Sequence, residues 1–158
     1  MSTDTTLRIV SDSSDRTEHI GALLARNLRG GEVIDLQSDL GGGKTTFVKG
    51  IASGIGITEP ITSPTFTVSR EYNGKNLKLV HFDLYRIGDP SIVSHIVSEA
   101  ASDKDVVTCI EWSGVAKEVL PNNKLTVKIE KHPNKESHRV ILLSLLPESG
   151  YLLKGLSL

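Results

Sequence analysis

The sequence predicts an α/β fold in which a mixed, mostly parallel sheet is flanked by helices. Short alternating or apolar runs, which are typical of strands, take turns along the chain with segments whose apolar residues recur at helical spacing. A glycine-rich segment, residues 38–46, joins an early apolar run to one of these helical segments. Residues 65–83 contain two β-rich runs around Asn73 and Gly74, which predicts an antiparallel hairpin closed by a two-residue turn.

The periodicity also predicts the individual elements. Residues 14–28 are expected to form the first helix because Ile20, Leu24 and Leu28 follow helical spacing before two glycines. Residues 106–110 form a continuous apolar run, which is typical of a central strand buried on both faces. The other predicted elements are strands at 6–10, 33–36, 125–130 and 139–145, and helices at 44–53, 92–101 and 115–120.

Two later segments carry more specific expectations. The third helix is predicted to begin at Ile92 with Ser91 as its cap, and Ile92, Ile96 and Ala100 should share one side of it. The tail beyond about residue 147 has no clear pattern and is expected to be peripheral.

Length and composition favour one globular domain that spans residues 1–158. The formal net charge is −1, which gives no global attraction to nucleic acid or to an anionic membrane. The single cysteine, Cys109, excludes a disulfide framework and fits a reducing compartment. The first residues lack the basic start and apolar core of a signal peptide, and no apolar run reaches membrane-spanning length. We therefore expect a cytoplasmic protein without a membrane partner.

Residues 38–46 carry the end of a phosphate-binding P-loop. Glycines let successive backbone N–H groups turn toward phosphate oxygens, and the N-terminus of the following helix adds its unpaired N–H groups. Lys44 is expected to reach the β- and γ-phosphates, and the Thr45 hydroxyl to bind Mg²⁺. Ser38 stands where the usual motif has its first glycine, which a serine can replace if φ stays negative. The predicted nucleotide-binding residues are Asp39, Leu40, Gly41, Gly42, Gly43, Lys44, Thr45 and Thr46.

Two acidic residues that end predicted strands are candidates for the rest of the site. Glu111 follows the apolar run 106–110, the position from which a Walker B carboxylate completes the Mg²⁺ shell beside a P-loop. Asp83 ends the hairpin and is the candidate for hydrolysis, in which water attacks the γ-phosphate in line. Each acid taken alone is also explained as a cap or turn residue. Lys44, Glu111 and Asp83 are the predicted catalytic residues.

The loop after the P-loop helix carries two hydroxyl side chains, Ser63 and Thr65. It is similar to a switch segment that senses the γ-phosphate, although an ordinary strand-initiating turn explains the same residues. The five histidines show no metal-ligand spacing and the chain has no Cys/His cluster, so a zinc site is not expected.

Four segments of the sequence, 39–47, 63–67 (SPTFT), 81–86 (HFDLYR) and 110–112 (IEW), match one family in order and spacing. Through them the chain resembles the TsaE (YjeE) family of small bacterial P-loop ATPases over roughly residues 6–130. The resemblance implies a P-loop NTPase-like fold and a role in making N6-threonylcarbamoyladenosine (t6A) at position 37 of tRNAs that read ANN codons. It also implies that the protein binds ATP and Mg²⁺, hydrolyses ATP weakly alone, and is stimulated by the TsaB–TsaD heterodimer. TsaD would transfer the threonylcarbamoyl group, and tRNA would be reached through the complex.

Two site residues enter only through this resemblance. Trp112 matches the family's tryptophan beside the site, and Thr17, at the start of the first helix, matches a position near the nucleotide base. The other residues that match the family's motifs are those already named, with Lys44 and Thr45 for phosphate and Mg²⁺, Glu111 for the metal shell, Asp83 for hydrolysis, and Ser63 and Thr65 in the switch-like loop.

The sequence departs from the family's pattern at three places. Ser38 replaces a glycine, Ser113 and Gly114 replace the more usual Pro-Glu, and residues 91–105 lack an acidic, leucine-rich helix. Two other functions stay open on the residues alone. One is a small-molecule P-loop kinase. Such kinases generally need an arginine-bearing lid over the phosphates, and the scattered arginines of this sequence do not suggest one. The other is a nucleotide-binding adaptor that does not hydrolyse.

Overall fold

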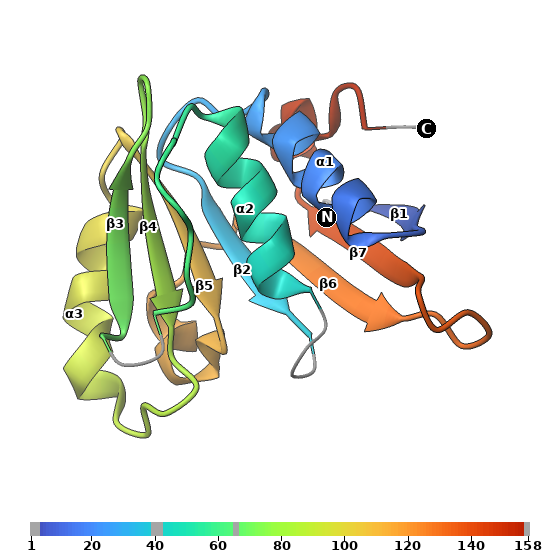
Figure 1. Ribbon diagram of the computed structural model, residues 1–158. Helices are drawn as coiled ribbons and strands as arrows, with labels where there is room; N and C mark the ends of the chain where they lie inside the picture. The colour runs from blue at the N-terminus through green and yellow to red at the C-terminus, as the bar shows by residue number, and fades with distance from the viewer. Residues whose placement is uncertain (1–3, 39–42, 65–66, 157–158) are drawn as a thin grey trace.

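The computed structural model of the protein describes residues 4–38, 43–64 and 67–156. In these ranges, seven strands form one sheet in the order β1-β7-β6-β2-β5-β4-β3, with helices on both faces (Figure 1). The strands are β1 (Thr5–Ser11), β2 (Val33–Gln37), β3 (Ser69–Asn73), β4 (Lys78–Asp83), β5 (Val106–Glu111), β6 (Leu125–Lys131) and β7 (Arg139–Leu145). The helices are α1 (Ser14–Ala25), α2 (Lys44–Gly54) and α3 (Pro90–Ala101), with the short 3-10 helices η1 (Ser113–Val119) and η2 (Pro147–Leu153).

The middle of the sheet is parallel. β2 runs parallel to its neighbours β5 and β6, and β4 continues the parallel part beside β5. The outer pairs, β1 with β7, β7 with β6, and β3 with β4, are antiparallel. The predicted mixed α/β sheet and the antiparallel hairpin are therefore confirmed. Because the carboxyl ends of parallel strands meet at one edge, the ends of β2, β4 and β5 lie together there.

Two hydrophobic clusters fill the space between the sheet and its helices. Leu36 and Cys109 belong to the cluster under α1 and α2, whereas Val33 and Ile110 belong to the cluster under α3 and η1 (Figure 1). Every residue of β5 is buried, which confirms the prediction of a central strand covered on both faces. No helix in the described ranges is long and apolar enough to cross a membrane.

α1 and α2 approach each other backbone to backbone. α1 begins where the Ser13 hydroxyl accepts a hydrogen bond from the Arg16 N–H at 3.1 Å, and it ends at Ala25, three residues earlier than predicted. Gly50 of α2 faces the Glu18 carbonyl of α1 so closely that a Cβ at position 50 would collide with that oxygen. The crossing therefore requires glycine at this position.

The prediction for α3 was wrong in its cap, and it did not say which side of the helix is buried. The Asp89 carboxylate, not Ser91, caps the helix by accepting the Ser91 N–H at 3.0 Å. The buried residues are Val93 and Val97, whereas Ile92 and Ile96 are 60% and 38% exposed. Both sets follow helical spacing, so the sequence pattern alone did not decide which of them meets the sheet.

The hairpin has a four-residue connection instead of the predicted two-residue turn. Asn73 pairs with Lys78 in the ladder, and the Gly74 N–H bonds the Leu77 carbonyl at 2.9 Å. The Lys75 N–H meanwhile bonds the Ile55 carbonyl, also at 2.9 Å, so the turn is held against the end of α2. This contact, which is distant in sequence, explains why the local turn signal was misleading.

The C-terminal tail is part of the core, contrary to the expectation that it is peripheral. Leu152 and Leu156 are buried in the cluster under α1. The Asn27 amide donates to the Leu152 carbonyl at 2.9 Å, and the Tyr151 hydroxyl donates to the Glu32 carboxylate at 2.7 Å. Partial burial and the bond to Glu32 raise the pKa of Tyr151 to about 12. The tail lacks long-range periodicity because its anchors are single residues.

Candidate nucleotide-binding site

The described part of the P-loop begins at Gly43, which has φ 107° and is the N-cap of α2. Side chains with a Cβ rarely adopt this conformation, so glycine is required here. Gly43 has no side chain to cap the helix, which leaves the N–H groups of the first turn for another acceptor. Ser38 ends the strand side of the loop and is not among the non-glycine residues with a positive φ in the described part of the chain. The predicted binding residues Asp39, Leu40, Gly41 and Gly42 lie outside the described residues.

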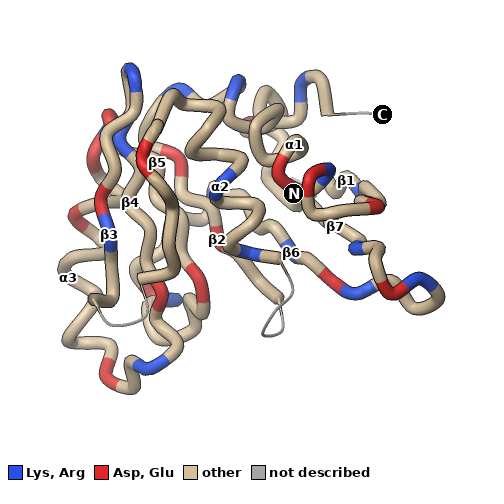
Figure 2. Tube along the Cα trace, in the orientation of Figure 1, with Lys and Arg blue, Asp and Glu red and all other residues tan. Residues whose placement is uncertain are grey.

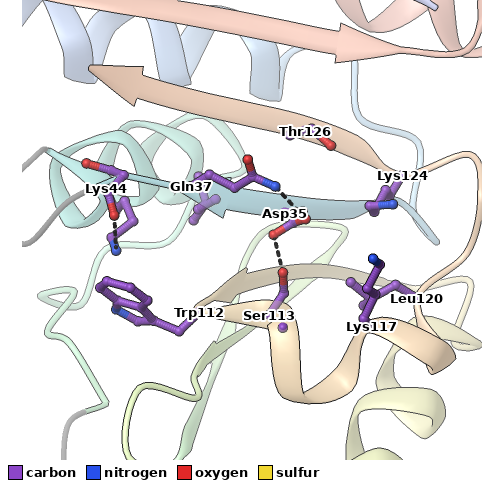
Figure 3. A pocket seen from close by; sticks show the side chains of 12 residues that line it. Asp35, Gln37, Lys44, Trp112, Ser113, Lys117, Leu120, Lys124 and Thr126 are labelled. Carbon is purple, nitrogen blue, oxygen red and sulfur yellow. Dashed lines mark hydrogen bonds between the residues drawn. The ribbon is translucent and has the colours of Figure 1, made fainter. Parts of the chain in front are cut away.

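Lys44 is the buried cation of this site, only 7% exposed at the first position of α2. Its Nζ donates to the Ser38 carbonyl at 3.3 Å and lies 4.0 Å from Glu111 Oε1. The same nitrogen lies 4.1 Å from the centroid of the Trp112 ring (Figure 3). The ammonium group is thus held between the end of β2, the end of β5 and an aromatic face.

The two predicted carboxylates lie side by side, because Asp83 pairs with Glu111 in the parallel ladder of β4 and β5. Asp83 Oδ1 accepts the Tyr85 N–H at 3.1 Å, and its Oδ2 accepts the Ser63 hydroxyl at 3.3 Å. The structure therefore brings Asp83, Glu111 and Lys44 to one edge of the sheet. It also brings Ser63 of the proposed switch-like loop to Asp83, whereas Thr65 lies outside the described residues.

Trp112 follows Glu111 in a strained conformation. Its φ is 57°, an unusual value for an aromatic residue. The Tyr85 ring lies 4.9 Å from it between centroids, and the next residue, Ser113, donates its hydroxyl to Asp35 Oδ1 at 2.6 Å. These contacts fix the ring beside Lys44, and its part in nucleotide binding stays a prediction.

A pocket of about 500 Å³ lies between β2, β6 and η1, next to Lys44 and Trp112 (Figure 3). Asp35, only 3% exposed, lines it between Gln37 and Ser113. Sequence analysis missed Asp35 and Ser113, and also the fully buried His81 of β4. The available signal was a polar residue inside an otherwise apolar strand, at position 35 in β2 and at position 81 in β4.

The three threonines predicted to bind the nucleotide lie in the first turns of α1 and α2. Thr45 and Thr46 follow Lys44 in the first turn of α2 and are half-buried. Thr17 of α1 is buried, and its hydroxyl shares a 2.7 Å hydrogen bond with that of Ser11. This bond ties the start of α1 to the end of β1, and the role of Thr17 near a nucleotide base stays a prediction.

The residues present fit a Mg²⁺ ion that takes only part of its ligands from the protein. Among the described residues, no group of three or more His, Cys, Asp or Glu side chains is arranged to hold a metal ion. Mg²⁺ is usually bound by one or two protein oxygens together with phosphate oxygens and water, and Thr45 and Glu111 offer those protein oxygens. A magnesium ion here would therefore depend on the bound nucleotide.

The charges relevant to a phosphate ligand are local. Basic and acidic residues are interspersed along the trace in the view of Figure 2. The Glu111 carboxylate also affects a residue of the core. Burial, and to a smaller extent the negative charge of Glu111, raises the pKa of the Cys109 thiol well above its usual range. Cys109 is accordingly an unreactive core residue.

Comparison with known proteins gives a consistent result. The family model described as "Threonylcarbamoyl adenosine biosynthesis protein TsaE" matches residues 11–141. Relatives named tRNA threonylcarbamoyladenosine biosynthesis protein TsaE include one from Bacillus subtilis, 39% identical over 117 residues (74% of this chain and 73% of the relative). Another, from Treponema pallidum, is 39% identical over 123 residues (78% and 90%). The crystal structure of YdiB from Bacillus subtilis superposes with a TM-score of 0.81 at 29% identity, covering 99% of this chain and 97% of that one.

Proposed function

The chain belongs to the TsaE family, and from that premise we propose that it is a Mg²⁺-dependent ATPase required for t6A modification at position 37 of tRNAs that read ANN codons. It acts with the TsaB–TsaD heterodimer in the cytoplasm and reaches tRNA through that complex. Its relatives carry the name of this biosynthesis, and the near-neutral net charge of −1 favours an indirect contact with tRNA.

One observation carries the ATPase part of the proposal. The buried ammonium of Lys44 stands at the N-terminus of α2, 4.0 Å from Glu111 Oε1, and Asp83 is the ladder partner of Glu111. A triphosphate needs a cation and helix N–H groups for its charge, and its hydrolysis needs a carboxylate near the attacking water. Lys44, the N-terminus of α2 and Asp83 offer such groups at one edge of the sheet, which supports the proposal.

Each residue then has a separate task. Lys44 would exchange its contacts with Ser38, Glu111 and Trp112 for phosphate oxygens. Thr45 and Glu111 would hold Mg²⁺, which would offset negative charge on the phosphates. Asp83 orients the water for in-line attack on the γ-phosphate. Its bond to the Ser63 hydroxyl, 3.3 Å long, links this carboxylate to the switch-like loop.

The test is ATP turnover by the purified protein, alone and with reconstituted TsaB–TsaD and tRNA. We expect weak turnover alone and a clear increase with the partners. A non-hydrolysing adaptor would bind ATP without turnover in every mixture. A kinase would transfer the phosphate to a small acceptor rather than release it. If TsaB–TsaD neither binds the protein nor changes its rate, the assigned pathway is wrong.

A further inference from the structure

His81 has a fully buried imidazole ring, and it has no role in the mechanism proposed above. It lies on β4, two residues before Asp83, and its exposed fraction is 0%. Its Nε2 lies 2.5 Å from Glu111 Oε2 on the neighbouring strand β5. A buried polar side chain loses its hydration, so its hydrogen bonds indicate what it does.

The chemistry of the carboxylate gives the direction of this hydrogen bond. An ionised carboxylate oxygen can only accept, so Nε2 carries the hydrogen and donates it to Oε2. The other ring nitrogen, Nδ1, is buried without a hydrogen-bond partner among the described residues. The contact with Glu111 is thus the one polar interaction of this ring in the described part of the chain.

The bond leaves the two oxygens of Glu111 in different surroundings. Oε2 is held by His81 within the sheet, and Oε1 lies 4.0 Å from Lys44 Nζ, on the side of the P-loop helix. We propose that His81 is a positioning residue for Glu111, holding Oε2 so that Oε1 is turned toward the site where Mg²⁺ and the phosphates bind. This inference rests on the proposed function. Groups that orient metal-binding side chains in this way are typically worth about 10- to 100-fold in metal affinity.

A purely structural role for His81 predicts a different outcome, and Thr108 provides the matched control. Thr108 is fully buried on β5, and its hydroxyl also lacks a hydrogen-bond partner among the described residues. Its ladder partner is Val80, directly before His81. Thr108→Val therefore alters a buried polar group in the same part of the sheet, without removing a bond to Glu111.

The experiment measures Mn²⁺ binding, as a probe for Mg²⁺, to the ADP-bound protein by electron paramagnetic resonance of free Mn²⁺. His81→Leu removes the donor and should weaken Mn²⁺ binding by about 10- to 100-fold. His81→Gln places an amide N–H near the position of Nε2 and should restore most of the affinity. Thr108→Val should bind Mn²⁺ like wild type. ADP affinity without metal, measured by calorimetry, should not change in any variant.

Two outcomes would overturn the inference: wild-type Mn²⁺ affinity in His81→Leu, or equal weakening in Thr108→Val. If His81→Leu does not fold, His81→Asn replaces it, because its shorter amide falls short of Glu111 while the site stays polar. Equal Mn²⁺ affinity of the Gln and Asn variants would then refute the role. Wild-type protein that does not bind ADP and Mn²⁺ would refute the proposed function itself. Loss of Mn²⁺ in Glu111→Gln but not in the His81 variants would refute this inference alone.

Discussion

At the scale of single residues, Lys44 is the charge around which the site is arranged. Its contacts include the Ser38 carbonyl at 3.3 Å, Glu111 Oε1 at 4.0 Å and the face of the Trp112 ring. Contacts of this kind hold the ammonium in place but are weaker than the charge-assisted hydrogen bonds that phosphate oxygens provide. In the proposed function, phosphate oxygens would replace these contacts.

Lys44→Ala should weaken ATP binding by about 10- to 100-fold, because a hydrogen bond to a charged group contributes roughly 1.5–3 kcal/mol and each 1.4 kcal/mol is a factor of ten. Isothermal titration calorimetry with ATP and Mg²⁺ measures the change. Lys49→Ala, which removes an exposed lysine of the same helix, is the control and should bind like wild type. An unchanged affinity in Lys44→Ala would contradict the P-loop interpretation.

Asp83→Asn should keep ATP binding and lower turnover by about 100- to 10,000-fold, the usual contribution of a positioned acid or base. The amide can still accept the Tyr85 N–H, so the local turn should survive. Phosphate release under saturating ATP measures the rate, and Asp105→Asn, at an exposed position before β5, is the matched control. Wild-type turnover in Asp83→Asn would remove this residue from the mechanism.

Much of the candidate site could be predicted because Lys44, Asp83 and Glu111 stand at strand or helix ends, where local sequence signals are strong. Two hydrogen bonds of the site could not be predicted. The Asp35–Ser113 bond joins residues 78 positions apart and the His81–Glu111 bond joins residues 30 positions apart. Both pairs meet only through the order and register of the strands. A single sequence contains the polar residues of such pairs but not their partners.

At the scale of elements, the sequence pattern located the strands and helices within a few residues. It did not show which side of each helix faces the core. The two possible stripes of α3 are equally apolar, and only the neighbouring sheet decides between them. Val97 is fully buried, whereas Ile96, the adjacent residue, is 38% exposed. This pair allows a direct test of which stripe faces the core.

Val97→Ala should lower stability by about 2 kcal/mol, because it removes buried methyl groups and leaves a cavity. For a chain of this size, that corresponds to a fall in Tm of about 4–8 °C. Ile96→Ala, its control, should change Tm by only a small fraction of this amount. Thermal unfolding followed by circular dichroism measures both. A larger loss in Ile96→Ala would mean that α3 is rotated about its axis.

Tyr151 of η2 gives a test by pH. Its pKa is raised from 10.0 to about 12 in the folded protein. Between these values the unfolded chain loses the phenolic proton and the folded chain keeps it, so the free energy of unfolding should decrease as pH rises from 10 toward 12. Tyr151→Phe should show a smaller decrease over the same range, and Tyr85→Phe, at a side chain that is 54% exposed, should behave like wild type. Denaturant midpoints at both ends of the range measure this, and equal slopes in all three proteins would contradict it.

At the scale of the whole molecule, the sheet could be predicted because the glycine loop and the apolar run that becomes β5 both require parallel strands with helices on two faces. The place of the tail could not, because Leu152 and Leu156 join the core as single anchors without periodicity. A truncation before η2 would therefore remove core residues from a domain whose sheet is otherwise complete.

The glycine contact between α1 and α2 has a mechanical consequence. Backbone touches backbone where Gly50 faces the Glu18 carbonyl, so no flexible side chain there can absorb a relative shift. The Ser11–Thr17 hydrogen bond in turn ties α1 to β1, which forms the edge of the sheet beside β7. A continuous line of rigid contacts therefore joins the helix that follows the glycine loop to the far edge of the sheet.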